Sequence, residues 1–282
     1  MALPSGLTFS KTIWWAGVFL VLGVYFFAQR PLPLADAGSA GRTIPVETMF
    51  RIIAAENDAA RGMYTKDIVG AGMKAGLDFS ENWRETNVAA GPLPALFLRE
   101  AATSIQKTKI PLGLFLGSDY PIAQSNKFVS TQAERFQALR VSSKPEFFYA
   151  PDIKLQAAMF PDLAMAPGCV TCHNEHPKSP KVDWKLGDIM GATTWSYPKD
   201  KVTLDEMMQI IAAYRGGVVA AYEAYLAKAA KFSKPPEVGD RWPKDGYFLP
   251  TTAVFVKEFE RRASGATINA LLHANSPLKP PG

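Results

Sequence analysis

The sequence is poor in the residue types that most often bind metals or form covalent cross-links. Its 282 residues include only two cysteines and three histidines. Cys169 and Cys172 lie three positions apart, so this one pair cannot form the disulfide framework that stabilises small secreted folds. The pair is expected to be a redox couple, half of a metal site, or the attachment point of a heme.

The sequence also lacks any concentration of basic residues. The formal net charge is +5, with no run of five or more lysines and arginines and no basic stripe interleaved with aromatics. This pattern argues against a nucleic-acid partner. Hydrophobic residues make up 48% and charged residues 20% of the chain. These fractions predict an ordered, globular protein.

Only one apolar run approaches the length of a bilayer. Residues 12–28 carry no charge over about 17 positions, between Lys11 and Arg30, with aromatic residues near both ends. Such a run is at the lower limit for a membrane-spanning helix, and aromatics are typical of its interfaces. We interpret residues 1–30 as an uncleaved membrane anchor and residues 31–44, rich in proline and glycine, as a linker.

Two other interpretations concern membrane topology. A cleaved signal peptide is the alternative to the anchor, with residues 35–37 (Ala-Asp-Ala) as the candidate site. The next most apolar stretch, residues 207–230, contains Arg215, Glu223 and Lys228. We predict that it forms a soluble amphipathic helix rather than a second membrane span.

The motif that predicts a specific chemistry is Cys-Val-Thr-Cys-His at residues 169–173. A C-x-x-C-H sequence is typical of c-type heme attachment. Thiols at positions i and i+3 of a helical turn both reach the vinyl groups on one edge of the porphyrin. The next residue, His173, then lies beneath the iron and serves as an axial ligand. We therefore predict one covalent heme c on Cys169 and Cys172, with His173 as the iron ligand.

Two other chemistries fit a cysteine pair less well. A thioredoxin-like redox pair needs a strand-to-helix junction within a βαβ unit, which the stretch Met165–Gly168 does not suggest. A zinc site needs four ligands, and beyond His173 the chain offers only His176 and His273 as further histidines.

The second axial ligand is left open by the sequence. His176 is on the same side of the iron as His173, and a structural hydrogen bond to backbone is the better expectation for it. The other candidates are His273, a tyrosine, an open position, or one of eight methionines, each of which also fits core packing: Met49, Met63, Met73, Met159, Met165, Met190, Met207 and Met208. Lys178, Lys181 and Lys185 form either a docking rim for an acidic redox partner or a solvated loop face.

Secondary-structure signals predict an α+β fold between residues 45 and 198. Helical patterns cover about 45–68, 93–107 and 131–140, and strand patterns cover 110–117, 146–150 and 187–197. Glycines at 70, 72 and 76 are expected to break the first helix. After residue 198 the pattern becomes helical, with helices predicted at 203–232 and about 252–263. The first of these has a capping box at Thr203 and Glu206, and Gly216-Gly217 as a possible bend.

The neighbourhood of the motif resembles a known family. Gly187-Asp188-Ile189-Met190-Gly191-Ala192 follows the C-x-x-C-H box, and Phe147-Phe148-Tyr149-Ala150-Pro151 precedes it. Over residues 45–198 the chain resembles a periplasmic c-type heme domain, found alone and in bacterial sensor kinases and chemoreceptors. The resemblance implies a PAS-like fold, an antiparallel sheet with flanking helices around the heme. One member type uses a cysteine as second ligand, which this chain lacks because both cysteines are needed for thioethers.

These expectations combine into a function. Heme is attached on the outer side of the bacterial inner membrane, so the bulk of the chain is expected in the periplasm. We expect a single-pass, membrane-anchored monoheme cytochrome c that transfers electrons or serves as a heme-bearing subunit of a larger membrane complex. Residues 199–282 would be a helical extension that packs against partners. The alternative is a redox or gas sensor that signals through a separate protein. No distal His/Arg arrangement suggests an enzyme.

Overall fold

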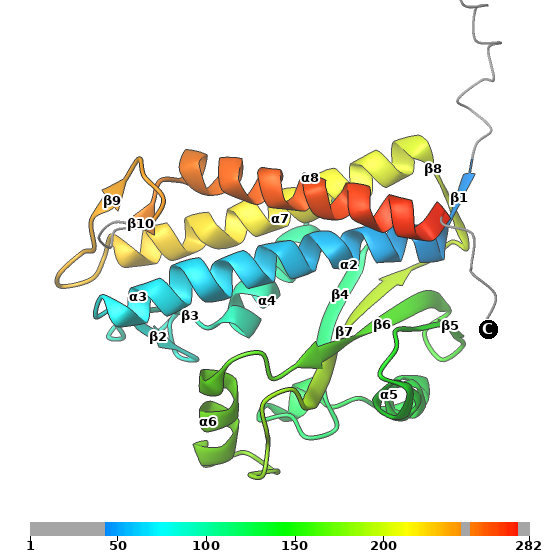
Figure 1. Cartoon of the computed structure of the whole chain (residues 1–282), viewed down its shortest axis with the longest axis horizontal. Helices are drawn as coiled ribbons and strands as arrows, with labels where there is room; N and C mark the ends of the chain where they lie inside the picture. The colour runs from blue at the N-terminus through cyan, green and yellow to red at the C-terminus, as the bar shows by residue number, and fades with distance from the viewer. Residues whose placement is uncertain (1–42, 244–248, 276–282) are drawn as a thin grey trace, which may run out of the picture. The chain divides into compact units, whose positions relative to one another are not determined.

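The computed structural model describes residues 43–243 and 249–275. The predicted anchor and nearly all of the predicted linker lie outside these residues. The predicted α+β class is confirmed: helices cover both faces of a small antiparallel sheet (Figure 1). The described residues form one compact unit. Among the described residues, no helix has both the length and the apolar character needed to cross a bilayer.

The main sheet has four strands in the spatial order β4-β7-β6-β5, and all neighbours are antiparallel. Its strands are β4 (Gly113–Gly117), β5 (Glu146–Ala150), β6 (Leu155–Leu163) and β7 (Ile189–Tyr197). The sequence predicted β4, β5 and β7 but missed β6. Its start, Leu-Gln-Ala-Ala-Met, consists of good helix formers, and pairing with two neighbouring strands outweighs that local preference.

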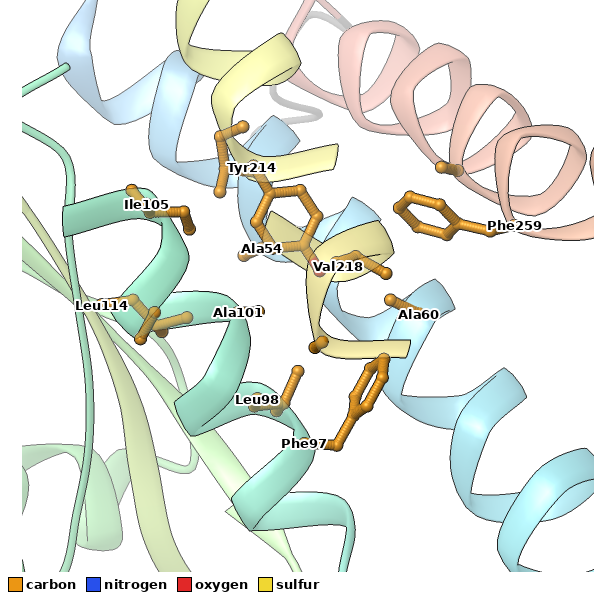
Figure 2. Packing of buried hydrophobic residues seen from close by; sticks show 14 of the residues in the cluster. Ala54, Ala60, Phe97, Leu98, Ala101, Ile105, Leu114, Tyr214, Val218 and Phe259 are labelled. Atoms are coloured by element: carbon orange, nitrogen blue, oxygen red, sulfur yellow. The ribbon is translucent and has the colours of Figure 1, made fainter. Parts of the chain in front are cut away.

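One face of the sheet is covered by a helical layer. Its long helices are α2 (Val46–Met63), α4 (Pro94–Gln106), α7 (Leu204–Ala229) and α8 (Thr252–Asn275). α7 packs along α4, and α8 packs along α2. Figure 2 shows side chains from this layer and the sheet meeting in one core, among them Phe97, Tyr214 and Phe259. All four helices were predicted, but α8 continues well beyond Ala263.

The end of the first helix differs from the prediction. α2 continues directly into a π-helical segment, η2 (Tyr64–Gly70), and then into α3 (Ala71–Lys74). The prediction that Gly70 and Gly72 break the helix is wrong. Each glycine lowers helix stability by only about 1 kcal/mol relative to alanine, and the buried side chains of η2 hold the segment on the core. The chain turns at Gly76, where φ is +86°.

The opposite face of the sheet has its own small core. α5 (Ser130–Ser142) inserts Phe136 and Leu139 against Phe148 of β5 and Met159 of β6. The sheet is therefore buried on both faces, which explains why its strands do not show a simple alternation of apolar and polar residues.

The start and middle of α7 follow specific sequence signals. Thr203 and Glu206 form the predicted capping box, with Glu206 N donating to Thr203 Oγ1 at 3.1 Å and Thr203 N donating to Glu206 Oε2 at 2.9 Å. The helix is continuous through Gly216 and Gly217. A Cβ at Gly217 would lie 2.8 Å from the Ala101 carbonyl oxygen. This glycine therefore allows the close packing of α7 on α4.

Short paired strands position the loops. β1 (Thr43–Pro45) pairs with β8 (Lys201–Thr203), which joins the start of α2 to the start of α7. β2 (Asp78–Ser80) pairs with β3 (Ala90–Pro92), and the loop between them extends toward the predicted site. A third pair, β9 (Val238–Gly239) and β10 (Leu249–Pro250), precedes α8.

Candidate functional site

The C-x-x-C-H motif forms a short helix directly after the central strand β6. This helix, α6, spans Pro167–Glu175. Ala166 is extended, as residues before proline are, and Pro167 begins the helix at a position where its missing N–H is not needed. At the other end His176 is again extended before Pro177. Two prolines thus fix the limits of a helix that contains the whole motif.

The three predicted site residues lie on one face of α6. Cys169, Cys172 and His173 have the spacing i, i+3 and i+4, which places side chains next to one another on a helix. Neither cysteine forms a disulfide. Cys172 is exposed, whereas Cys169 and His173 are half-buried. The structure therefore brings together two free thiols and an imidazole at the protein surface.

The His173 ring has one nitrogen inside the protein. Its Nδ1 atom is buried and has no hydrogen-bond partner among the described residues. Burial lowers the pKa of the ring, the nearby carboxylate of Asp162 raises it, and His176 lowers it. The net direction is downward, so His173 is neutral at pH 7, which is the form in which histidine binds a metal.

His176 has the structural role that the sequence predicted. Its Nδ1 accepts a hydrogen bond from the backbone N–H of Lys178 at 3.1 Å, so in the neutral ring the proton is on Nε2. Nε2 lies 3.2 Å from Oε1 of Glu81 in the β2–β3 loop. His176 therefore links the end of α6 to the β2–β3 loop, and both of its ring nitrogens are in use.

Replacing His176 by alanine should loosen the end of α6. We expect a loss of about 1 kcal/mol in the free energy of unfolding, the usual value of one hydrogen bond, and faster amide exchange in Cys172–Glu175. The matched control is His273→Ala on the exposed part of α8, which should change stability by less than about 0.5 kcal/mol. Urea denaturation and hydrogen exchange measure both effects. Equal exchange rates in the two variants would contradict the assigned role.

The loop after α6 is attached to the same helix. The Asn174 side chain donates to the Trp184 carbonyl at 3.0 Å and accepts from the Trp184 backbone N–H at 2.9 Å. Farther along, Gly187 N donates to the Ala164 carbonyl at 3.0 Å and Ala164 N to the Asp188 carbonyl at 2.9 Å. The motif and the strand that follows it are thus one connected element.

The sequence did not predict a cluster of charged side chains from α2 and β6 that lies beside α6. Arg61 of α2 forms an ion pair with Asp162, near the end of β6. The pKa of Asp58, one turn earlier on α2, is raised to about 6, mainly by loss of surrounding water, with Arg61 lowering it and Asp162 raising it. The Asp58 side chain is nevertheless exposed at the surface, so water screens much of this effect. No local pattern marks Arg61 and Asp162 as partners, because about a hundred residues separate them.

The geometry around α6 distinguishes the alternative chemistries for the cysteine pair. Contrary to expectation, the cysteine pair does follow a strand, but β7 returns antiparallel to β6, so no βαβ unit is present. The pKa of Cys172 is raised, mainly by loss of water around the sulfur and also by Glu81, Cys169 and Glu175, which disfavours a reactive thiolate. Among the described residues, no group of three or more His, Cys, Asp or Glu side chains is arranged to bind a metal ion.

The candidates for a second axial ligand occupy different environments. Met49, Met63, Met159 and Met207 are core residues with at most 3% exposure. Met73, Met165 and Met208 are exposed, and Met190 is half-buried. His273 is exposed on the last part of α8, which lies away from α6 in Figure 1.

The lysines after the motif are mixed with acidic residues. Lys181 pairs with Asp183 and lies 4.7 Å from the centre of the Trp184 ring. The backbone N–H of Lys185 donates to the Asp188 carboxylate at 2.8 Å. The loop therefore carries both signs of charge, and this mixture favours a solvated face over a basic docking rim.

A surface pocket lies elsewhere on the molecule. It has a volume of about 330 Å³ and lies between the start of α2 and the β5–β6 hairpin, with Phe50, Phe147 and Asp200 in its wall. Neither the cysteines nor His173 line it. The pocket is therefore not part of the candidate site.

Comparison with known proteins identifies a family. A family model described as Tll0287-like matches residues 45–198, more than half of the chain. The chain belongs to the Tll0287-like family. No curated protein and no solved structure matches it. The family match contains the sheet, α2, α4 and α6, and it ends before α7 and α8, which nevertheless contribute to the same hydrophobic core.

Proposed function

We propose that the chain carries one covalent c-type heme, attached through Cys169 and Cys172, with His173 as an axial iron ligand. The observation that carries the proposal is the common face of these three side chains on α6. Two free thiols at i and i+3 match the attachment chemistry, and the adjacent imidazole matches the axial ligand.

Two further observations support the fit. No residue of α6 is fully buried, so this nine-residue helix, too short to be stable alone, lacks the apolar packing that a porphyrin face would supply. In addition, the buried nitrogen of His173 is Nδ1, which leaves Nε2 as the nitrogen for the iron.

The sheet topology also suits the PAS-like fold that the sequence resemblance implies. The sheet is small and antiparallel, its last strand lies between the first and the third, and helices cover both faces.

We further propose that the protein is a membrane-anchored, periplasm-facing monoheme cytochrome c, acting in electron transfer or as a heme-bearing subunit of a membrane complex. When bound, the heme supplies a one-electron Fe(III)/Fe(II) couple. On α6 the Cys172 side chain is exposed and that of Cys169 is half-buried, so a heme held there would have an edge within reach of a redox partner. Residues 12–28 would provide the anchor in the bacterial inner membrane.

An optical experiment separates electron transfer from gas sensing. The full chain is produced with its heme, reduced, and its spectrum recorded before and after addition of CO or NO. We expect a six-coordinate iron whose spectrum does not change with CO, and a positive midpoint potential. Rapid CO binding to a five-coordinate iron would overturn electron transfer and favour a sensor that signals through a separate protein.

A further inference from the structure

Three ends of long helices lie together at one end of the helical layer. β1 pairs with β8, which joins the start of α2 to the start of α7. α8 runs antiparallel to α2: Arg262 pairs with Asp67 of η2. Farther along α8, Thr267 donates to Glu56, which lies earlier in α2. The last turns of α8 therefore lie where α2 and α7 begin, next to β1 (Figure 1). We call this region the β1 end.

Large apolar side chains are exposed at the β1 end. On α7, Leu204 and Met208 are both more than half exposed, and their i, i+4 spacing places them on one face of the helix. On α8, Ile268 and Leu272 are more than half exposed, and Leu271 is exposed as well. Single exposed apolar residues are common, but a group of this size at one end of a fold is typical of an interaction surface.

Charge at the β1 end favours an apolar contact. Residues 263–275, the last part of α8, contain no Asp, Glu, Lys or Arg. Residues 199–206, which lead into α7, contain two lysines and three acidic residues, so their charges nearly cancel. Lys199 is also paired with Glu206. The region therefore offers neither a basic nor an acidic surface to a charged partner, whereas a bilayer interface accepts apolar side chains without such a charge.

The proposed anchor joins the described structure at the same end. Residues 29–42, only 14 positions, separate the apolar run 12–28 from Thr43. A linker of this length spans at most about 50 Å when fully extended. Thr43 is the first residue of β1, and it pairs with Thr203, directly before Leu204. The chain thus connects to its anchor beside the exposed apolar side chains of α7.

We propose that the β1 end contacts the interfacial region of the bilayer that holds residues 12–28, through Leu204 and Met208 of α7 and through Ile268, Leu271 and Leu272 of α8. This inference rests on the membrane anchor of the proposed function and is independent of the heme. Apolar side chains in such a contact are buried at the boundary between lipid headgroups and acyl chains.

The contact would also orient the candidate site. The start of β7 is bonded to the segment before α6, and the end of β7 leads into β8. β7 has nine residues, so roughly 25 Å separates its two ends. With the β1 end on the bilayer, α6 lies at the far end of β7. A heme on α6 is then accessible to a soluble periplasmic partner.

Photo-crosslinking of the full, heme-loaded chain tests the contact. The photoreactive residue p-benzoylphenylalanine is placed at Met208, Ile268 or Leu272, one position at a time, and the protein is reconstituted in phosphatidylethanolamine/phosphatidylglycerol vesicles. The matched control is Leu186, an equally exposed leucine in the loop between α6 and β7. After illumination, mass spectrometry should find about tenfold more phospholipid adduct at the three test positions than at Leu186.

Flotation of the vesicles is measured first, because it tests the anchor separately. A full chain that does not float with the vesicles would overturn both the anchor and the contact. For a chain that floats, phospholipid adduct above the Leu186 level at two or more test positions supports the contact. Fewer positions, or crosslinks to a second copy of the chain in place of lipid, would overturn it and leave the anchor standing. Since the three positions are exposed and tested separately, one variant that does not fold leaves two that decide.

Discussion

Replacing both motif cysteines by alanine should eliminate covalent heme entirely. The Cys169→Ala/Cys172→Ala protein is expected to show no heme on a denaturing gel, whereas each single variant retains one thiol and gives partial attachment. The reason is that these are the only two cysteines in the chain. The measurement is in-gel heme staining of equal amounts of folded protein, with wild type as reference.

The polypeptide itself should tolerate this change. Both cysteines lie on a surface helix, Cys172 is exposed, and alanine is the best helix former. We expect the unfolding free energies of heme-free wild type and heme-free double variant to agree within about 0.5 kcal/mol. The double variant retaining heme on a denaturing gel would contradict the attachment site.

The second large effect is expected in the helical layer. Glu56 of α2 is fully buried and accepts two hydrogen bonds from Arg215 of α7, at 2.7 and 2.9 Å. Thr267 of α8 also donates to this carboxylate. One buried carboxylate therefore joins three helices. Arg215→Met leaves it without its cation, and we expect a loss of about 3–5 kcal/mol in the free energy of unfolding.

A surface pair with the same chemistry provides the control. Arg84 pairs with Glu100, but the Arg84 side chain is 62% exposed. Arg84→Met should therefore cost at most about 1 kcal/mol. Adding Glu56→Met to Arg215→Met should recover part of the loss, since no unpaired charge stays buried. Urea denaturation of all variants tests this, and equal costs for Arg215→Met and Arg84→Met would be inconsistent with the buried network.

Local sequence signals predicted the elements that local forces determine. The capping box at Thr203, the strand Glu146–Ala150 and the helical turn of the motif are all encoded within a few residues. The structural role of His176 also followed from its position three residues after His173. In each case the signal and the structure lie within one turn or strand.

Non-local forces account for what was missed. β6 has a helix-like sequence, and its strand pairing with β5 and β7 is decided by residues far along the chain. The helix continues through Gly70 because packing outweighs the glycine penalty, and α8 likewise continues through Gly265 to Asn275. The Arg61–Asp162 pair depends on how α2 and β6 are brought together.

The most direct measurement of the central claim is the intact mass of the full chain, produced in cells that attach c-type hemes, followed by peptide mapping. The account predicts the mass of the polypeptide plus one heme, and a heme-bearing peptide that contains Cys169, Cys172 and His173. The mass of the unmodified polypeptide from such cells, or a heme on any other peptide, would contradict it.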